Sequence, residues 1–156
     1  MAKSYYSTVL EGSADAVWAV IRDFGNYAWA GASGETIIEE GRAGDAVGAV
    51  RSVRTADRHI RQRLVAHSDV ERSYTYEFAD NIPFPVRNYR ATLCITPVID
   101  GGKAFVEWWA TFDCQPEELE RWQRYFREDG FAIWLGALRR HFAVVATEGT
   151  GRGGEI

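Results

Sequence analysis

The order of helical and extended patterns is the feature of this sequence that most restricts its fold. From residue 35 to residue 113, apolar and polar residues alternate in short runs, and turn residues separate the runs. This spacing is typical of antiparallel strands joined by tight connections. Helical spacing flanks the region on both sides. The chain is therefore expected to be α+β, with one antiparallel sheet between two helical segments.

Seven strands are predicted for this sheet. The first covers residues 5–11, and the others are expected near 35–40, 47–55, 59–67, 72–79, 86–97 and 103–114. Pro83 and Pro85 lie between two of these runs, where they suit a connection, because proline cannot donate a hydrogen bond to a strand ladder.

A short helix is predicted between the first two strands. Ser13 is a suitable N-cap, since its hydroxyl can accept a hydrogen bond from a free backbone amide, and the helix is expected to end near Gly25. Residues 25–34 are predicted to form a short irregular or helical link. The sheet should therefore have two short helices between its first and second strands.

A long helix is predicted after the last strand. Pro116 is favourable at its first position, because that position has no use for an amide proton. The helix is expected to run to about residue 147, a length of roughly 45 Å at 1.5 Å per residue. Gly130 and Gly136 interrupt its apolar pattern, so we expect a bend or a close approach there. A curved sheet wrapped around this helix would accommodate all the predicted elements.

Length and composition fit one globular domain. The chain has 156 residues, is 46% hydrophobic and has a net charge of -4. We predict a single domain over residues 1–148 and a flexible, glycine-rich tail over 149–156. Cys94 and Cys114 form no C-x-x-C motif and are expected to be free thiols in the cytoplasm. No apolar run of about 18 residues and no signal-peptide pattern is present, so membrane insertion is not expected. A monomer and a homodimer both stay open.

Three patterns that often mark cofactor or nucleic-acid sites are interpreted otherwise. Residues 149–154 match G-x-G-x-x-G but follow a predicted helix, whereas a dinucleotide site needs a preceding strand. His59 and His67 would lie about 26 Å apart along one strand, too far to share a metal ion. Five arginines between residues 51 and 63 are expected on a solvated face of an acidic protein. We therefore predict no metal, no organic cofactor and no nucleic-acid partner.

Several local strings resemble the START/polyketide cyclase-dehydrase (SRPBCC) superfamily. They are residues 14–18 (ADAVW), 48–53 (GAVRSV), 62–64 (QRL), 73–76 (SYTY), 85–93 (PVRNYRATL) and 107–112 (EWWATF). The resemblance covers about residues 3–147 and is strongest to small, stand-alone bacterial members. It implies the helix-grip fold, in which a curved seven-stranded antiparallel sheet wraps around a long C-terminal helix and leaves a ligand cavity between them.

The superfamily includes enzymes, lipid carriers and receptors, so the resemblance alone leaves the activity open. It implies that the cavity binds a small hydrophobic molecule, aromatic or polyketide-like. One use is cyclisation or dehydration by a cyclase-type lyase or isomerase. An alternative is a non-catalytic carrier or sensor of lipid-like ligands. A third is an interaction module whose cavity is filled by aromatic side chains, with Trp109 on its outer surface.

Strand alternation identifies the side chains expected to face the cavity, because successive residues point to opposite sides of a sheet. In the strand over 59–67, this places Ala66 inward and His67 outward. Together with residues from the long helix and the 81–86 loop, the predicted ligand-binding set is Gln62, Val53, Leu64, Tyr74, Tyr76, Phe84, Ala91, Trp108, Phe126 and Trp134.

Arg51 and Tyr89 are the predicted catalytic residues. Arg51 shares the inward face with Ala49 and Val53, and the Gly-x-x-Arg string of the superfamily matches residues 48–51. An inward guanidinium either holds the polar end of a ligand and stabilises an enolate, or is structural and bound to a carboxylate or to backbone carbonyls. Tyr89 is either a proton donor or a wall residue of the cavity.

Gln62 departs from the resembling proteins, in which a glutamate commonly precedes the Arg-Leu pair. An amide can hydrogen-bond a carbonyl but cannot take up a proton, which argues against acid–base catalysis at this position. Residues 81–86 contain two prolines and Phe84, and we predict either a lid over the cavity or a plain hairpin connection.

Overall fold

The computed structural model describes the backbone of residues 1–31 and 35–151, and the side chains of this range as far as residue 143. Its elements confirm the predicted α+β class, the seven strands and the two short helices between the first two strands. In chain order they are β1 (Ala2–Leu10), α1 (Ala14–Ile21), η1 (Ala28–Ala30), β2 (Glu35–Ile38), η2 (Glu39–Gly41), β3 (Val50–Arg54), β4 (His59–Ser68), β5 (Ser73–Phe78), β6 (Arg87–Val98), β7 (Lys103–Asp113), η3 (Pro116–Glu118), α2 (Leu119–Phe126), η4 (Arg127–Phe131) and α3 (Ala132–Gly151).

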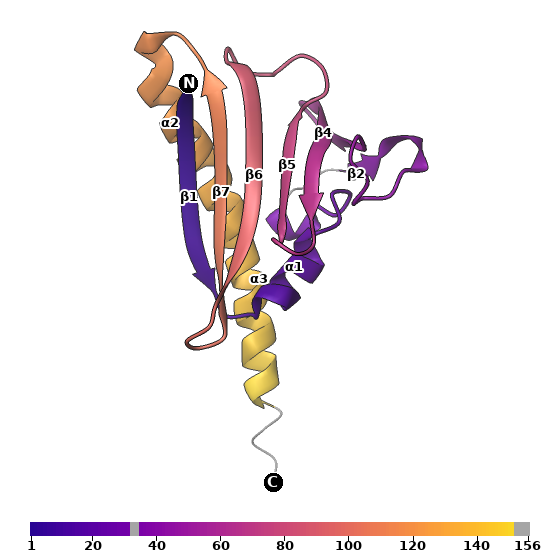
Figure 1. Ribbon diagram of the computed structural model, residues 1–156, viewed down its shortest axis with the longest axis vertical. Coiled ribbons are helices and arrows are strands. Elements are labelled where there is room, and N and C mark those ends of the chain that lie inside the picture. Colours follow the sequence, from indigo (N-terminus) through magenta and orange to yellow (C-terminus); the bar gives the residue numbers. More distant parts are fainter. Residues whose placement is uncertain (32–34, 152–156) are drawn as a thin grey trace.

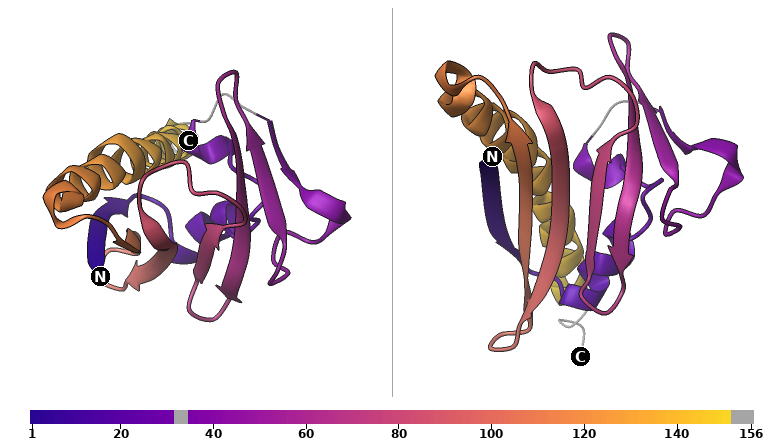
Figure 2. Two further views of the ribbon diagram at one scale, coloured as in Figure 1. Left: turned by 90° about the horizontal axis from the view of Figure 1, so that it is seen from above. Right: turned by 45° about the horizontal axis from the view of Figure 1, so that its top comes forward.

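The strands form one antiparallel sheet in the order β1-β7-β6-β5-β4-β3-β2 (Figure 1). The N-terminal strand therefore pairs with the last strand, and α1 and η1 carry the chain across to β2 at the opposite edge. The sheet is strongly curved, and the helical segment from α2 to α3 lies on its concave side (Figure 2). This arrangement confirms the predicted helix-grip fold and places the interior between the sheet and the long helix.

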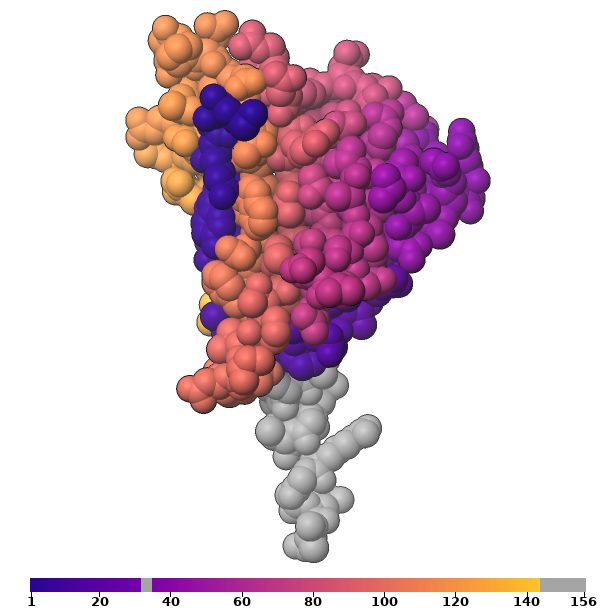
Figure 3. All heavy atoms as spheres, in the orientation of Figure 1, coloured from indigo at the N-terminus to yellow at the C-terminus, as the bar shows by residue number. Residues whose placement is uncertain are grey.

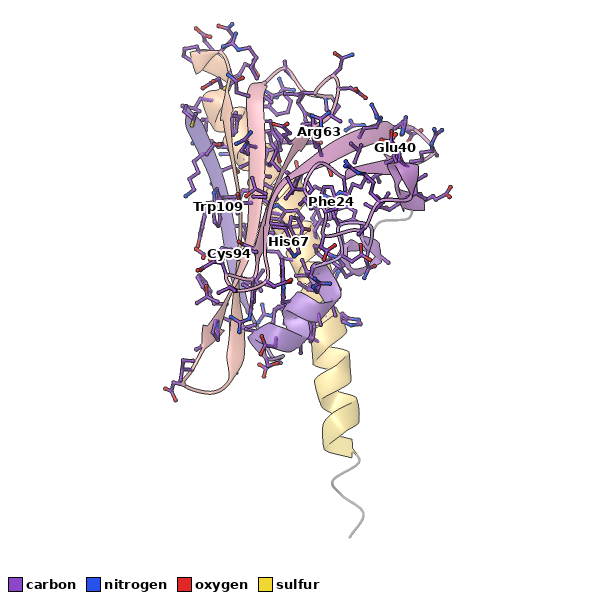
Figure 4. The ribbon with its side chains drawn as sticks, turned by 45° about the vertical axis from the view of Figure 1, so that its right-hand side comes forward. Phe24, Glu40, Arg63, His67, Cys94 and Trp109 are labelled. Atoms are coloured by element: carbon purple, nitrogen blue, oxygen red, sulfur yellow. The ribbon has the colours of Figure 1, made fainter. Side chains whose placement is uncertain are left out.

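The two faces of the sheet differ in burial as the alternation predicts. On β7, Val106, Trp108, Ala110 and Phe112 have no exposed surface and point toward the helices. Trp109, the neighbour of Trp108, belongs to the outer face, where the ammonium group of Lys3 lies 5.1 Å from its ring. Figure 3 views this outer face, and Figure 4 labels Trp109 on it and Phe24 in the interior.

A β-bulge reverses the predicted orientation of the last residues of β4. Leu64 pairs with Tyr76, but Ala66 pairs with Thr75, so one residue of β4 is left over between these pairs. As a result Ala66 is exposed, and the side chain of His67 is only 8% exposed and packs with its ring centroid 5.3 Å from that of Trp18. The prediction of Ala66 inward and His67 outward is therefore wrong, because an extra residue shifts the alternation by one.

The predicted long helix is composed of several segments. Pro116 lies in the initial 3₁₀ turn η3, and the π-helical η4 separates α2 from α3. Gly130 lies within η4, where a Cβ atom would lie 3.4 Å from the ring of Trp134, so the expected bend or close approach is found there. At Gly136 a Cβ atom would meet only Arg140 Nη1, at 3.6 Å, and the helix continues unchanged.

The remaining differences concern element ends. β2 stops at Ile38 because Glu40 adopts φ 60°, and β3 begins at Val50 because Gly48 adopts φ 94°. Ser13 caps α1 as expected by accepting a hydrogen bond from the Ala16 amide, but the helix ends at Ile21. α3 continues to Gly151, and residues 152–156 of the predicted tail lie outside the described residues. Among the helices described, none combines the length and apolar character needed to span a bilayer.

Candidate ligand cavity

A cavity of about 130 Å³ lies between the concave face of the sheet and the junction of α2, η4 and α3. β4, β5 and β6 supply one side of it, the helical segment supplies the opposite side, and the β5–β6 loop contributes Phe84. The lining residues are Arg58, Ile60, Gln62, Tyr76, Phe78, Phe84, Tyr89, Tyr125, Phe126, Asp129, Gly130, Phe131 and Trp134.

Aromatic rings that contact each other make up most of the wall. The centroid of the Tyr89 ring lies 5.1 Å from that of Phe126 and 5.0 Å from that of Phe78. Phe84 completes the wall from the loop, with ring centroids of Tyr125 and Phe126 both at 5.4 Å. Pairs at these spacings stabilise one another beyond the area that they bury. The wall is therefore apolar and braced by contacts between rings.

Arg51 is fully buried next to the cavity but does not line it. Its guanidinium carbon lies 4.1 Å from the centroid of the Phe24 ring, 4.3 Å from that of Tyr27 and 5.0 Å from that of Tyr76. Such distances are typical of cation–π contacts, which partly compensate a buried cation for lost hydration. Arg51 is thus held in an aromatic cage, which we define as Phe24, Tyr27 and Tyr76.

Arg51 makes its polar contacts with neutral groups. Its Nε donates to Gln62 Oε1 at 2.8 Å, and Nη1 donates to the carbonyl of Phe24 at 3.5 Å. Nη2 is buried and has no hydrogen-bond partner. Within the described part of the chain no carboxylate forms an ion pair with Arg51. The predicted alternative, a structural Arg51 bound to a carboxylate or to backbone carbonyls, is therefore found only in part. One backbone carbonyl and the Gln62 amide accept its hydrogen bonds.

The contact with Arg51 also fixes the orientation of the Gln62 amide. Arg51 and Gln62 lie directly opposite each other in the β3–β4 ladder. Because a guanidinium can only donate, the atom of Gln62 that faces it must be the carbonyl oxygen. The Gln62 side chain lines the cavity, and its NH₂ group has no hydrogen-bond partner among the described residues. Gln62 therefore offers hydrogen-bond donors.

The tyrosines around Arg51 are held in their neutral form. Burial raises the pKa of Tyr89 well above its usual value, and neighbouring Tyr76 and Tyr27 raise it further, whereas the nearby Arg51 charge lowers it. Burial likewise raises the pKa of Tyr76 and Tyr27, again against the effect of Arg51. Tyr76 Oη also accepts a hydrogen bond from Trp108 Nε1 at 3.2 Å. These hydroxyls can donate hydrogen bonds but are poorly suited to ionise.

Two charged residues lie where the cavity meets the surface. Arg58, from the β3–β4 turn, and Asp129, from η4, both line the cavity and are both exposed. The guanidinium carbon of Arg58 lies 5.7 Å from the centroid of the Phe84 ring. Asp129 is the one carboxylate among the residues that line the cavity. The outer end of the cavity is therefore polar, and its inner end is aromatic.

The structure brings together half of the predicted site. Gln62, Tyr76, Phe84, Tyr89, Phe126 and Trp134 line the cavity, whereas Arg51, Val53, Leu64, Tyr74, Ala91 and Trp108 are buried in the surrounding core. Trp108 shows the reason, since its ring stacks on Phe131 at 5.0 Å and lies 5.1 Å from Trp134. Alternation identified the inward face, but side chains fill one end of that face and leave only the other end hollow.

Sequence reasoning missed several lining residues. Alternation predicted Ile60 and Phe78 to point inward, but neither was included in the predicted ligand-binding set. Asp129 and Gly130 gave no such signal, because their position depends on the π-helical turn. As for metal sites, no group of three His, Cys, Asp or Glu residues that could hold an ion occurs in the ranges covered by the structure.

Comparison with known proteins supports the assignment of fold and family. The family model described as "Polyketide cyclase / dehydrase and lipid transport" matches residues 1–146. A protein from Thermobifida fusca with a solution NMR structure is 30% identical, with a TM-score of 0.80 over 91% of this chain and 93% of that chain. XoxI from Bacillus cereus is 28% identical, with a TM-score of 0.78 over 94% and 99% of the two chains.

A more distant structure shares the fold alone. The di-domain ARO/CYC protein BexL from the BE-7585A biosynthetic pathway is 15% identical, with a TM-score of 0.75 over 94% of this chain and 48% of BexL. None of the curated proteins matches the sequence.

Proposed function

The chain belongs to the polyketide cyclase / dehydrase and lipid transport family, and on this basis we propose that it binds a small hydrophobic, aromatic molecule in the cavity between sheet and helix. Ligand cavities in proteins are mostly apolar and use a few polar groups to orient the bound molecule. The aromatic wall fits the first property. Gln62 and Tyr89 fit the second, since both present hydrogen-bond donors to the same space.

One observation carries this proposal: the cavity holds an amide donor without a protein partner. The Gln62 side chain is only partly buried, and its two N–H groups donate to no described protein group. A ligand oxygen that accepts from this amide would be held in one orientation. Arg51 enters the proposal as a positioning residue, because it fixes the direction of that amide and does not itself line the cavity.

A catalytic use is a second candidate, favoured because Tyr89 and Asp129 line the same cavity. In a cyclisation, Asp129 would take a proton from a carbon beside a carbonyl group of the bound molecule. Gln62 and Tyr89 would hold the resulting enolate oxygen by hydrogen bonds. The enolate carbon would then attack a second carbonyl of the same molecule, breaking its C=O π bond. The new alkoxide would take a proton from solvent, and Asp129 would return its proton to solvent. Positioning supplies much of the acceleration in such reactions.

Binding can be tested by ¹⁹F NMR titration with fluorobenzene, a ligand with the size of one ring, together with native mass spectrometry of the purified protein. We expect saturable fluorobenzene binding to the unmodified chain. The variant Ile60→Phe should abolish it, because Ile60 lines the cavity and a larger ring would occupy the space.

Ile133→Phe is the matched control, since Ile133 is 54% exposed and does not line the cavity. This variant should bind fluorobenzene as the unmodified chain does. Absence of binding to the unmodified chain, or equal binding to the Ile60→Phe variant, would contradict the proposal.

A further inference from the structure

The size of the cavity limits the ligand to a single ring. A dry, apolar cavity of about 150 Å³ in a protein holds one benzene molecule. The cavity here measures about 130 Å³, and its inner end is closed by Phe131 and Tyr76, which are 1% and 2% exposed. Two fused rings would fit within this volume only if the aromatic side chains at its inner end moved apart. A monocyclic compound therefore fits where a multi-ring polyketide does not.

The Gln62 amide favours a ligand that accepts hydrogen bonds. The Gln62 carbonyl oxygen is occupied by Arg51, so the amide turns its two N–H donors elsewhere. Tyr89 is kept protonated by burial, which raises the pKa of its hydroxyl, and can donate as well. A ligand that presents an N–H or an ammonium group to the Gln62 amide would meet donors only, and the Tyr89 oxygen would be the one acceptor of this pair. An oxygen with free lone pairs would meet complementary partners.

The buried charge favours a ligand oxygen that carries negative charge. Arg51 is a permanent cation and is fully buried, and the residues around its guanidinium are neutral. Charges in a protein interior interact much more strongly than in water, because the surroundings screen them poorly. An anionic oxygen bound to the Gln62 amide would lie one side chain away from this cation. The interaction would stabilise the ionised form of an acidic hydroxyl. The charged groups that line the cavity, Arg58 and Asp129, are opposite in sign and exposed, so water screens both.

From these three observations we propose that the ligand is a monocyclic phenol, bound with its oxygen on the Gln62 amide and with its ionised form favoured by Arg51. This inference rests on the proposed function, because it specifies the ligand of the same cavity. A carboxylate such as benzoate fits less well, since the group is larger than a hydroxyl and the cavity measures only about 130 Å³.

The test compares, by ¹⁹F NMR titration, ligands that differ from 4-fluorophenol in the hydroxyl group, the number of rings or the charged group. We expect 4-fluorophenol to bind about 10- to 100-fold more tightly than 4-fluorotoluene, the range for a hydrogen bond to a charged group. 6-Fluoro-2-naphthol and 4-fluorobenzoate should both bind at least about tenfold more weakly than 4-fluorophenol. The fluorine shift reports ionisation, and we expect bound 4-fluorophenol to ionise at a lower pH than the free compound.

Two variants test the role assigned to Gln62. Gln62→Met removes the donors, and Gln62→Glu removes them while keeping an acceptor for Arg51, so at least one variant should fold. Both should lose the preference for 4-fluorophenol over 4-fluorotoluene. Gln115→Met, at an exposed position away from the cavity, should keep it.

The outcomes separate the two proposals. If fluorobenzene binds but 4-fluorophenol has no advantage over 4-fluorotoluene, the phenol assignment is overturned while the proposed function stands. Equal binding of the naphthol or the benzoate would overturn the assigned size or the assigned group. If no single-ring compound binds, the proposed function fails as well.

Discussion

At the scale of single residues, Arg51 shows what a local pattern can and cannot establish. Alternation along β3 and the Gly-x-x-Arg string correctly predicted an inward guanidinium. The partners could not be predicted, because they come from three distant segments: Phe24 and Tyr27 after α1, Gln62 on β4 and Tyr76 on β5. A buried arginine normally suggests a buried carboxylate, and here rings and an amide take its place.

The cage predicts an unusual result for Arg51→Met. Removing this cation loses its contacts with the rings and with Gln62, but it also removes a buried charge that no carboxylate neutralises. Replacement of a whole buried ion pair by apolar residues is often neutral, and the loss of Arg51 leaves no buried carboxylate unpaired among the described residues. We expect the free energy of unfolding, measured by urea denaturation, to change by less than about 2 kcal/mol.

Arg54→Met on the same strand is the control, since Arg54 is exposed and forms no ion pair with the described residues. Its unfolding free energy should stay close to that of the unmodified chain. A loss of more than about 4 kcal/mol in the Arg51 variant would show that the cation is required for the fold.

The buried tyrosines predict a loss of stability at alkaline pH. The pKa of Tyr27 is raised in the folded chain, chiefly by burial, so the folded state resists ionisation while the unfolded state ionises near pH 10. This group therefore leaves stability unaffected at neutral pH and lowers it as the pH rises above about 10. Tyr27→Phe should reduce the slope of stability against pH between about 9.5 and 11. Identical slopes in urea denaturation of both proteins would contradict this expectation.

At the scale of elements, the sequence predicted which segments are strands and helices better than how they are joined. Period-two and helical spacing correctly placed every strand and both main helical regions. The bulge in β4 and the π-turn η4 were not predictable, because each inserts a single residue that leaves the apolar pattern nearly unchanged. These two irregularities have local consequences, since one turns His67 inward and the other brings Asp129 and Gly130 to the cavity.

Gly130 provides a test of whether η4 serves the cavity or the stability of the helix. Alanine is favoured over glycine in a helix by up to about 1 kcal/mol, so Gly130→Ala should raise the free energy of unfolding. The added methyl group would lie against Trp134 and reduce the cavity, so fluorobenzene affinity should fall at least about threefold. Both quantities can be measured on one sample, by urea denaturation and by ¹⁹F NMR.

Gly136→Ala is the matched control, because Gly136 lies on α3 and does not line the cavity. It should gain similar stability and keep its fluorobenzene affinity. If both glycine variants bind equally well, η4 does not shape the binding space.

At the scale of the whole molecule, the interior is divided into a solid part and a hollow part. Trp108 and its ring neighbours fill one part of the space between the sheet and the long helix. The cavity lies in the other part, where the β3–β4 turn and the β5–β6 loop meet α2. Side-chain alternation describes a face, not a volume, so the sequence could predict the inward residues but not which of them leave space. The hollow end is where a ligand must enter and leave.

Phe84 is the part of the β5–β6 loop that closes this end. Its ring centroid lies 5.4 Å from those of Tyr125 and Phe126 and 5.7 Å from that of Trp122, so release of a ligand requires these contacts to break. Affinity changes between related complexes arise mostly from the dissociation rate. We therefore expect Phe84→Ala to speed fluorobenzene release by about tenfold, equivalent to about 1.4 kcal/mol of lost contacts. Exchange measurements by ¹⁹F NMR give this rate directly.

Phe105→Ala makes the same truncation on β7, away from the cavity, and should leave the rate unchanged. An unaltered release rate in the Phe84 variant would mean that the ligand leaves by another route and that this loop is a plain hairpin connection.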